Sequence, residues 1–190
     1  RWSPTEGLWI ERSAAAPIVE GELADGRSFR GQGKKFGIDA ENNLVLEGAA
    51  QGRLTDADGQ THEFWADRIR AGATGGEATG QVRAESPLGK GRGDQVVCTS
   101  VEGHVVHIEV TGDAFLERAD ISARGKRIVV DEVTGWIESE GIPGQPAWLR
   151  WSDGREIQGE WLRYNSLSQL FESRSFRLDT PPSPAEPSPR

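Results

Sequence analysis

The chain has 190 residues with 24 glycines, 7 tryptophans, no methionine and a formal net charge of −8. This length allows one domain with a hydrophobic core, and the glycine content favours short strands and tight turns over long helices. The negative charge argues against nucleic acid as a partner, because nucleic-acid binding requires clustered lysine and arginine.

The sequence carries no motif that indicates an enzyme or a metal site. Cys98 is the only cysteine, so no internal disulfide can form, and the histidines show no metal-binding spacing. No G-x-S-x-G or phosphate-binding loop is present, and no run approaches the roughly 18 apolar residues that span a bilayer. We therefore expect a protein without a cofactor that is not an enzyme.

Three segments are predicted along the chain. Residues 1–19 form a lead-in, in which Ser3–Ala16 is predicted as a short helix or an irregular stretch. Residues 20–178 form the body. Residues 179–190 hold five of the ten prolines and are predicted to be an extended linker or tail. Arg1 is not a natural start, so we expect that a signal peptide or an N-terminal membrane anchor has been removed.

The body contains an internal repeat of strand, turn and strand. A small residue is followed after three and five positions by apolar residues, at 33–39, 66–72, 93–99, 125–131 and 159–165. Because side chains two apart in a strand share a face, each pair predicts a half-buried strand. About five such units must stack to cover their apolar faces, which predicts an elongated all-β body.

Turn residues separate these strands. Asp39, Asp131 and Asn165 each follow an apolar pair, and such residues accept hydrogen bonds from the backbone two residues on. Asp25-Gly26, Asp58-Gly59 and Asp153-Gly154 predict two-residue hairpins.

The repeats resemble those of the OstA-like lipopolysaccharide-transport family, which includes LptA, LptC and the N-terminal domain of LptD. The resemblance is carried by GKRIVVDEVTGWIESEG (Gly125–Gly141) and LRWSDGREIQGEWLRYNSLSQLFES (Leu149–Ser173). It covers about residues 20–178 and is weaker in the glycine-rich part, residues 49–104.

The resemblance implies a twisted, half-open β-jellyroll in the periplasm. Such a protein shields the acyl chains of lipopolysaccharide in an apolar groove and docks to other jellyrolls through edge strands. An inner-membrane anchor would belong to the LptC branch, and the resemblance does not separate that branch from LptA. The positions that match the inward, lipid-binding set are Phe36, Ile38, Val45, Ile69, Val96, Cys98, Val105, Ile128, Val130, Ile137, Leu162, Tyr164 and Phe171.

Other interpretations of the same residues remain open at this point. The apolar pairs also fit a closed, dry core, as in a structural β-solenoid that assembles end to end. Trp148, Trp151 and Trp161 fit either strand packing or a sugar-stacking surface of a carbohydrate-binding module. A set of basic residues fits either lipid phosphates or a solvated strand face: Lys34, Lys35, Lys90, Arg92, Arg124, Lys126 and Arg127.

Overall fold

The computed structural model describes residues 2–3, 7–11, 18–22, 27–56 and 58–179. Within these ranges the chain forms strands and turns without a helix, which confirms the predicted all-β class. Accordingly, none of the described residues belongs to a helix able to cross a membrane. The strands are β1 (Trp2–Ser3), β2 (Gly7–Glu11), β3 (Ile18–Glu22), β4 (Ser28–Gln32), β5 (Lys35–Ile38), β6 (Leu44–Thr55), β7 (Thr61–Gly72), β8 (Gly75–Ser86), β9 (Gly89–Val101), β10 (His104–Glu117), β11 (Ile121–Asp131), β12 (Trp136–Glu140), β13 (Ala147–Trp151), β14 (Glu156–Asn165) and β15 (Phe171–Asp179).

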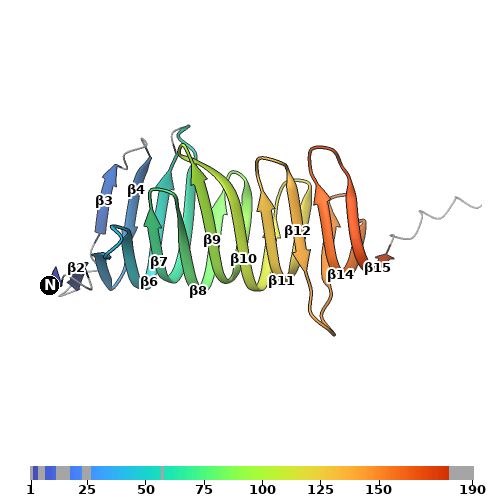
Figure 1. The fold of residues 1–190 in the computed structure, drawn as a ribbon, viewed down its shortest axis with the longest axis horizontal. Coiled ribbons are helices and arrows are strands. Elements are labelled where there is room, and N and C mark those ends of the chain that lie inside the picture. The colour runs from blue at the N-terminus through green and yellow to red at the C-terminus, as the bar shows by residue number, and fades with distance from the viewer. Residues whose placement is uncertain (1, 4–6, 12–17, 23–26, 57, 180–190) are drawn as a thin grey trace, which may run out of the picture.

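All of these strands belong to one antiparallel sheet that runs along an elongated body. From β5 to β12 each strand pairs with the next strand of the chain. Figure 1 shows the strands side by side along the long axis, with β3 near one end and β15 at the other. The predicted elongated all-β body is therefore present.

The sheet folds over on itself, so each long strand belongs to two layers. β6 pairs with β5 through Leu44–Glu47 but with β4 through residues 51–55. β11 likewise pairs with β12 through residues 127–131 and with β13 through residues 121–124. We call the layer that contains β2, β5 and β12 the first layer, and the layer that contains β3, β4 and β13 the second layer.

The long strands pass from one layer to the other along a line of β-bulges, which we call the closed edge. The register shifts in β6, β8 and β10 each include a glycine with positive φ, namely Gly48 at 76°, Gly80 at 79° and Gly112 at 73°. Only glycine adopts such angles without strain, and a bulge bends its strand locally. Glycines therefore set the position at which the sheet folds.

The two layers pack face to face through their apolar sides. An ideal Cβ placed on Gly52 of the second layer would lie 3.4 Å from Cδ1 of Ile69 in the first layer. A Cβ on Gly31 would lie 2.5 Å from Cδ1 of Leu46, closer than atoms tolerate. The backbones therefore approach closely at these two positions, and the core lies between the layers.

The predicted turn chemistry is confirmed at three positions. Oδ1 of Asp39, Asp131 and Asn165 each accepts a hydrogen bond at 3.0–3.1 Å from the backbone N–H two residues on. The two-residue hairpins predicted from Asp-Gly pairs are wrong where the structure describes both residues. The hairpins at Gly59 and Gly154 have three-residue loops instead. The glycine, with φ of 78° and 88°, is the third loop residue and forms a bulge.

The predicted lead-in, residues 1–19, contributes strands to the sheet. β2 pairs with β5, and β3, which begins at Ile18, pairs with β4. Where the structure describes residues of Ser3–Ala16, they are extended rather than helical. Asp25-Gly26 and residues 180–190 of the predicted tail lie outside the described residues.

Candidate functional site

Two cross-strand rows of side chains line the interior of the first layer. Residues directly opposite each other in a sheet point to the same face, so the register identifies each row. One row runs from Phe36 to Ser173 and the other from Ile38 to Phe171, both spanning β5 to β15. Eleven predicted lipid-binding residues lie in these rows: Phe36, Ile69, Val96, Ile128 and Leu162 in the first, and Ile38, Cys98, Val130, Ile137, Tyr164 and Phe171 in the second.

Burial along these rows is uneven. Ile128, Ile137 and Leu162 are completely buried, whereas Ile38, near the N-terminal end, keeps 36% of its surface exposed. Val105 also points inward, because it pairs with Ser100, two residues from Cys98. The interior is therefore tightly packed at some strands and accessible at others; whether these residues hold a lipid stays a prediction.

Val45 is the exception, and its predicted inward position is wrong. It pairs with Gly37 and Arg70, on the face opposite to Leu44 and Leu46. It is completely buried, yet it does not belong to the core cluster between the layers. The turn after Ile38 is one residue shorter than the turn after Val130, and a one-residue shift moves every side chain to the other face.

The sequence pattern missed half of the interior. The template identified the first layer at most of its strands, but it placed no inward residue correctly on β6, proposed none on β8, and missed the second layer. Leu46, Ile108 and Val110 fill the gaps in the two rows. The second layer adds Phe29, Phe64, Leu116, Ala123, Leu149 and Ile157. Apolar alternation in 106–110 was the signal that could have placed Ile108 and Val110 of β10 in the interior.

The second layer carries small residues at the middle of the body. Its central row reads Gly52, Phe64, Ala84, Gly91 and Leu116 from β6 to β10. Opposite it, Ala71, Gly76 and Ala78 of the first layer are also small. The facing layers therefore do not fill the interior between β6 and β9.

Two adjacent apolar cavities mark this unfilled part. One has a volume of about 60 Å³ and is lined by residues such as Phe29, Ile69 and Ala78. The other, of about 80 Å³, is lined by residues such as Val105 and Leu116. Leu54, Phe64, Val96 and Cys98 border both cavities. Ligand pockets usually enclose roughly 300–1,000 Å³, so neither cavity accommodates an acyl chain as it stands.

Opposite the closed edge the two layers end in separate turns, and we call this side the mouth. Where both partners are described, no backbone hydrogen bond joins the layers there. Side chains do so instead: Arg27 donates to the carbonyl oxygen of Ala73 at 3.1 Å, and Arg118 pairs with Glu132 at 3.0 Å. The turns that face each other are 39–43, 73–74, 102–103 and 131–135 of the first layer and 58–60, 87–88, 118–120 and 152–154 of the second layer.

Aromatic rings close the interior at its C-terminal end. The ring of Trp151, from the second layer, lies 5.5 Å from Tyr164 and 6.5 Å from Phe171 of the first layer, in edge-to-face geometry. Phe171 in turn contacts Phe176, which is 59% exposed on the terminal strand β15. Such pairs stabilise packing beyond area burial, so this end joins the layers firmly.

Cys98 is the one thiol in the interior, and its half-buried environment slows its reaction. Its side chain points between the layers and borders both cavities. Burial raises the pKa of the Cys98 thiol, which suppresses the reactive thiolate at neutral pH. Cys98 therefore behaves as a small hydrophobe that can report on occupancy of the cavities.

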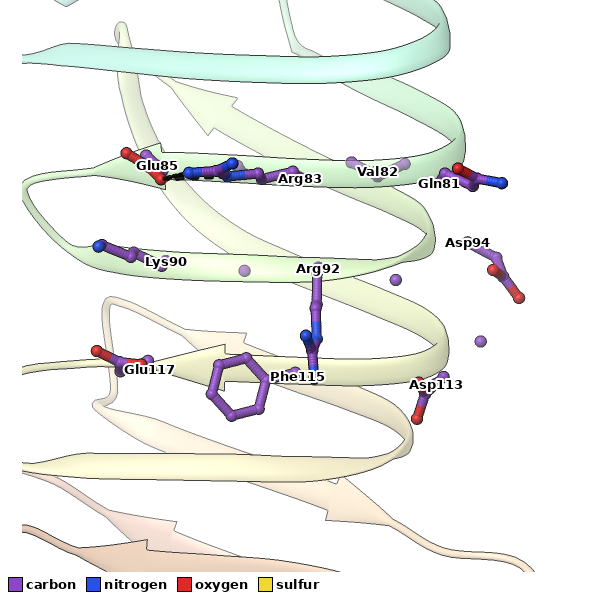
Figure 2. Close-up of a pocket in the computed structure, with 14 residues that line it drawn as sticks. Gln81, Val82, Arg83, Glu85, Lys90, Arg92, Asp94, Asp113, Phe115 and Glu117 are labelled. Carbon is purple, nitrogen blue, oxygen red and sulfur yellow. Dashed lines mark hydrogen bonds and ion pairs between the residues drawn. The ribbon is translucent and has the colours of Figure 1, made fainter.

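Larger hollows than these two cavities lie outside the interior. One, of about 500 Å³, lies on the outer face of the second layer, and Figure 2 shows Arg92 directed toward Phe115 and Arg83 joined to Glu85. The Arg92 guanidinium lies 5.0 Å from the centroid of Phe115. Acidic and basic side chains both border this hollow, including Asp94, so it lacks the apolar character of the interior.

The three tryptophans of the predicted sugar surface do not gather. Trp151 points into the interior, Trp148 lies on the outer face of the second layer, and Trp161 lies on the outer face of the first. The ring faces of the two outer residues are covered by arginines, with Arg150 at 5.1 Å and Arg174 at 5.3 Å from the centroids. This arrangement favours strand packing over a sugar platform.

The basic residues at the repeat starts lie on the outer faces, several of them in ion pairs. Arg127 contacts Glu109 at 2.6 Å and Glu140 at 3.3 Å. The Arg127 hydrogen bond lowers the pKa of Glu109, and Glu109 raises that of Arg127. Arg124 pairs with Asp113 at 2.7 Å. These ion pairs favour the interpretation that the basic residues belong to a solvated strand face.

Comparison with solved structures finds the same fold in LptH, the LptA homologous periplasmic component of the conserved lipopolysaccharide transport device from Pseudomonas aeruginosa. The match has a TM-score of 0.51 and 18% sequence identity, and it covers 72% of this chain and 94% of LptH. No protein-family model and no curated protein sequence matches this chain. At this identity the likeness establishes that the chain has the β-jellyroll fold of an LptA-like protein.

Proposed function

We propose that this chain is a periplasmic carrier of lipopolysaccharide or a related acylated lipid, of the LptA or LptC type. The observation that carries the proposal is the apolar interior, which runs from β5 to β15 and stays partly unfilled between β6 and β10. Apolar ligand surface buried there would gain about 25 cal/mol per Å². The fold shared with LptH supports the same role.

Loading in this proposal requires the layers to separate. The cavities of about 60 and 80 Å³ are too small for an acyl chain. The layers are covalently continuous at the closed edge, where positive-φ glycines such as Gly80 and Gly112 bend the strands. At the mouth they meet through side chains. The closed edge would act as a hinge, and acyl chains would enter through the mouth while sugars remain in water.

Docking to other jellyrolls is the second part of the proposal. Among the described strands, β15 pairs with β14 alone and β3 pairs with β4 alone. A strand with one unpaired side offers backbone donors and acceptors to a partner strand. Sedimentation at increasing protein concentration tests docking between copies of this chain. Species larger than a monomer are expected, and a monomer at every concentration would contradict self-docking.

The lipid role is tested by titrating the purified chain with lipopolysaccharide and measuring the reactivity of its only cysteine. Because Cys98 borders both cavities, we expect saturable protection from a small maleimide as lipid fills the interior. A matched control moves the thiol one residue, in a Cys98→Ser, Val97→Cys variant. Val97 pairs with Glu77 and Glu109 on the outer face, so its thiol should react equally with and without lipid.

The opposite result would identify a closed core. If lipopolysaccharide neither protects Cys98 nor changes tryptophan emission, while circular dichroism shows a folded β-rich protein, the carrier proposal is wrong. A structural β-solenoid would then explain the apolar rows.

A further inference from the structure

One ion pair at the mouth differs from the other contacts there. Arg118, in the turn after β10, belongs to the second layer, and Glu132, in the turn after β11, belongs to the first. Nη1 of Arg118 lies 3.0 Å and 3.3 Å from the two carboxylate oxygens of Glu132, and Nη2 lies 3.3 Å from one of them. This forked geometry is the strong form of an arginine–carboxylate contact.

The backbone of each partner is fixed within its own layer. The N–H of Arg118 donates to the carbonyl oxygen of Ile121 at 2.8 Å, and the N–H of Glu132 donates to that of Val106 at 3.0 Å. The two turns are therefore held independently of each other. Separation of the layers would break the ion pair without disturbing either turn.

The pair is placed where the apolar interior meets water. The side chains of Arg118 and Glu132 are only 21% and 19% exposed, and both border the 80 Å³ cavity together with Leu116 and Val130. Opening the mouth would leave a half-buried guanidinium without its carboxylate, which is unfavourable. An anion brought by the ligand to this boundary would relieve that cost.

The other described contacts across the mouth do not have this chemistry. His104 and Asp58 lie 3.7 Å apart and are 58% and 61% exposed. Among its contacts, Arg27 donates to the carbonyl oxygen of Ala73 and lies 3.4 Å from the hydroxyl of Ser100. Where both partners are described, Arg118–Glu132 is thus the arginine–carboxylate pair that bridges the layers at the mouth.

We propose that Arg118 recognises a phosphate on the headgroup of the acylated lipid. While the interior holds no lipid, Glu132 takes the place of that phosphate beside Arg118. The inference rests on the proposed carrier function. Arginine binds phosphate and carboxylate with the same planar fork, so one can replace the other without moving the side chain far. Glu132 would thereby act as a latch that holds the two layers together at the mouth when no lipid is bound. Arg118 would favour phosphorylated over unphosphorylated lipid.

The test measures protection of Cys98 by lipid A and by the same lipid with its phosphates removed. It compares the wild type, Arg118→Gln, Arg118→Lys and Glu132→Gln. The wild type should bind the phosphorylated lipid about tenfold more tightly or better, the effect of one charge-assisted fork. Arg118→Gln should lose this preference, and Arg118→Lys should lose most of it because a lysine lacks the fork. Glu132→Gln should bind both lipids more tightly and keep the preference.

A matched control is the outer pair of Arg124 and Asp113, which lie 2.7 Å apart and away from the mouth. Arg124→Gln should leave both affinities unchanged. Inorganic phosphate alone should not protect Cys98; protection by it would assign the site to a free anion and overturn the headgroup role.

The outcomes separate this inference from the carrier function. If the wild type binds neither lipid, the carrier proposal is wrong, and the inference that rests on it is wrong as well. If the wild type binds both lipids equally, or if folded Arg118→Gln and Arg118→Lys keep the full preference, the carrier function stands and the inference is overturned. An unchanged affinity in Glu132→Gln would overturn its role as a latch.

Discussion

Truncation of Ile128 tests whether the C-terminal half of the body is a tightly packed core. Ile128 is completely buried and lies in the first interior row between Val110 and Ser139. The change Ile128→Ala removes three carbon atoms, which is about 2.4 kcal/mol at roughly 0.8 kcal/mol per buried methylene. The cavity left behind adds to this, so we expect a loss of about 3 kcal/mol, within the ~2–5 kcal/mol of such changes.

Urea unfolding followed by tryptophan fluorescence measures this loss as a lower midpoint at an unchanged slope. The matched control is Val129→Ala, one residue along the same strand. Val129 pairs with Glu109 and Glu138 on the outer face and is half-buried, so its truncation should cost well under half as much. A loss below about 1 kcal/mol for Ile128→Ala would refute tight packing between the layers at β11.

Three further predictions concern the closed edge, a turn and the interior thiol. In Gly125→Ala the new Cβ would lie 2.5 Å from the carbonyl oxygen of Glu140. We therefore expect the free energy of unfolding, measured in urea, to fall by about 1–3 kcal/mol. A neutral effect would show that β11 and β12 can move apart at this point. The pKa of Asp131 is lowered below its ordinary 3.8, mainly by the hydrogen bond from the backbone N–H of Thr134. The ionised carboxylate therefore stabilises the fold above that pH. This contribution is lost as the pH falls through the lower pKa of the folded state. Asp131→Asn should therefore lose less stability on acidification than the wild type, and parallel pH profiles would contradict this. The raised pKa of the half-buried Cys98 predicts slower reaction with a disulfide reagent near neutral pH than in denaturant. Equal rates would show that the fold does not shield the thiol.

The repeat predicted the fold well because each apolar pair reports directly on one strand face. The template segments lie in β5, β7, β9, β11 and β14, and their apolar positions point into the interior. This success depends on the fixed alternation of side chains in a strand, which local sequence determines. The pattern could not extend to Val45, because the length of one turn decided its face.

The two-layer arrangement could not be predicted from the same pattern. It depends on bulges inside long strands, where Gly48, Gly80 and Gly112 adopt positive φ. In the sequence these glycines look like ordinary members of a glycine-rich chain. The Arg118–Glu132 ion pair was equally hidden, because the two residues are brought together only when the layers fold face to face.

The size of the facing side chains differs along the body, so the two layers are not equally free to separate in its two halves. From β10 to β14 the facing positions carry large, fully buried residues such as Ile137, Leu149 and Leu162, and the aromatic group around Trp151 joins the layers at the end. From β6 to β9 the facing positions include Gly52, Ala84 and Gly91, and the cavities lie there and extend to β10.

Separating well-packed layers would expose large apolar surfaces, whereas separating the β6–β9 part exposes less. The mouth should therefore open first over β6–β9, with the packed C-terminal half serving as the fixed end of the hinge. Arg118 and Glu132 lie at the border of these two parts, bordering the cavity on one side and near the packed strands β10 and β11 on the other. If the carrier proposal holds, an ion pair at this border would control opening where the layers begin to separate, and a headgroup that replaces Glu132 would act at that border.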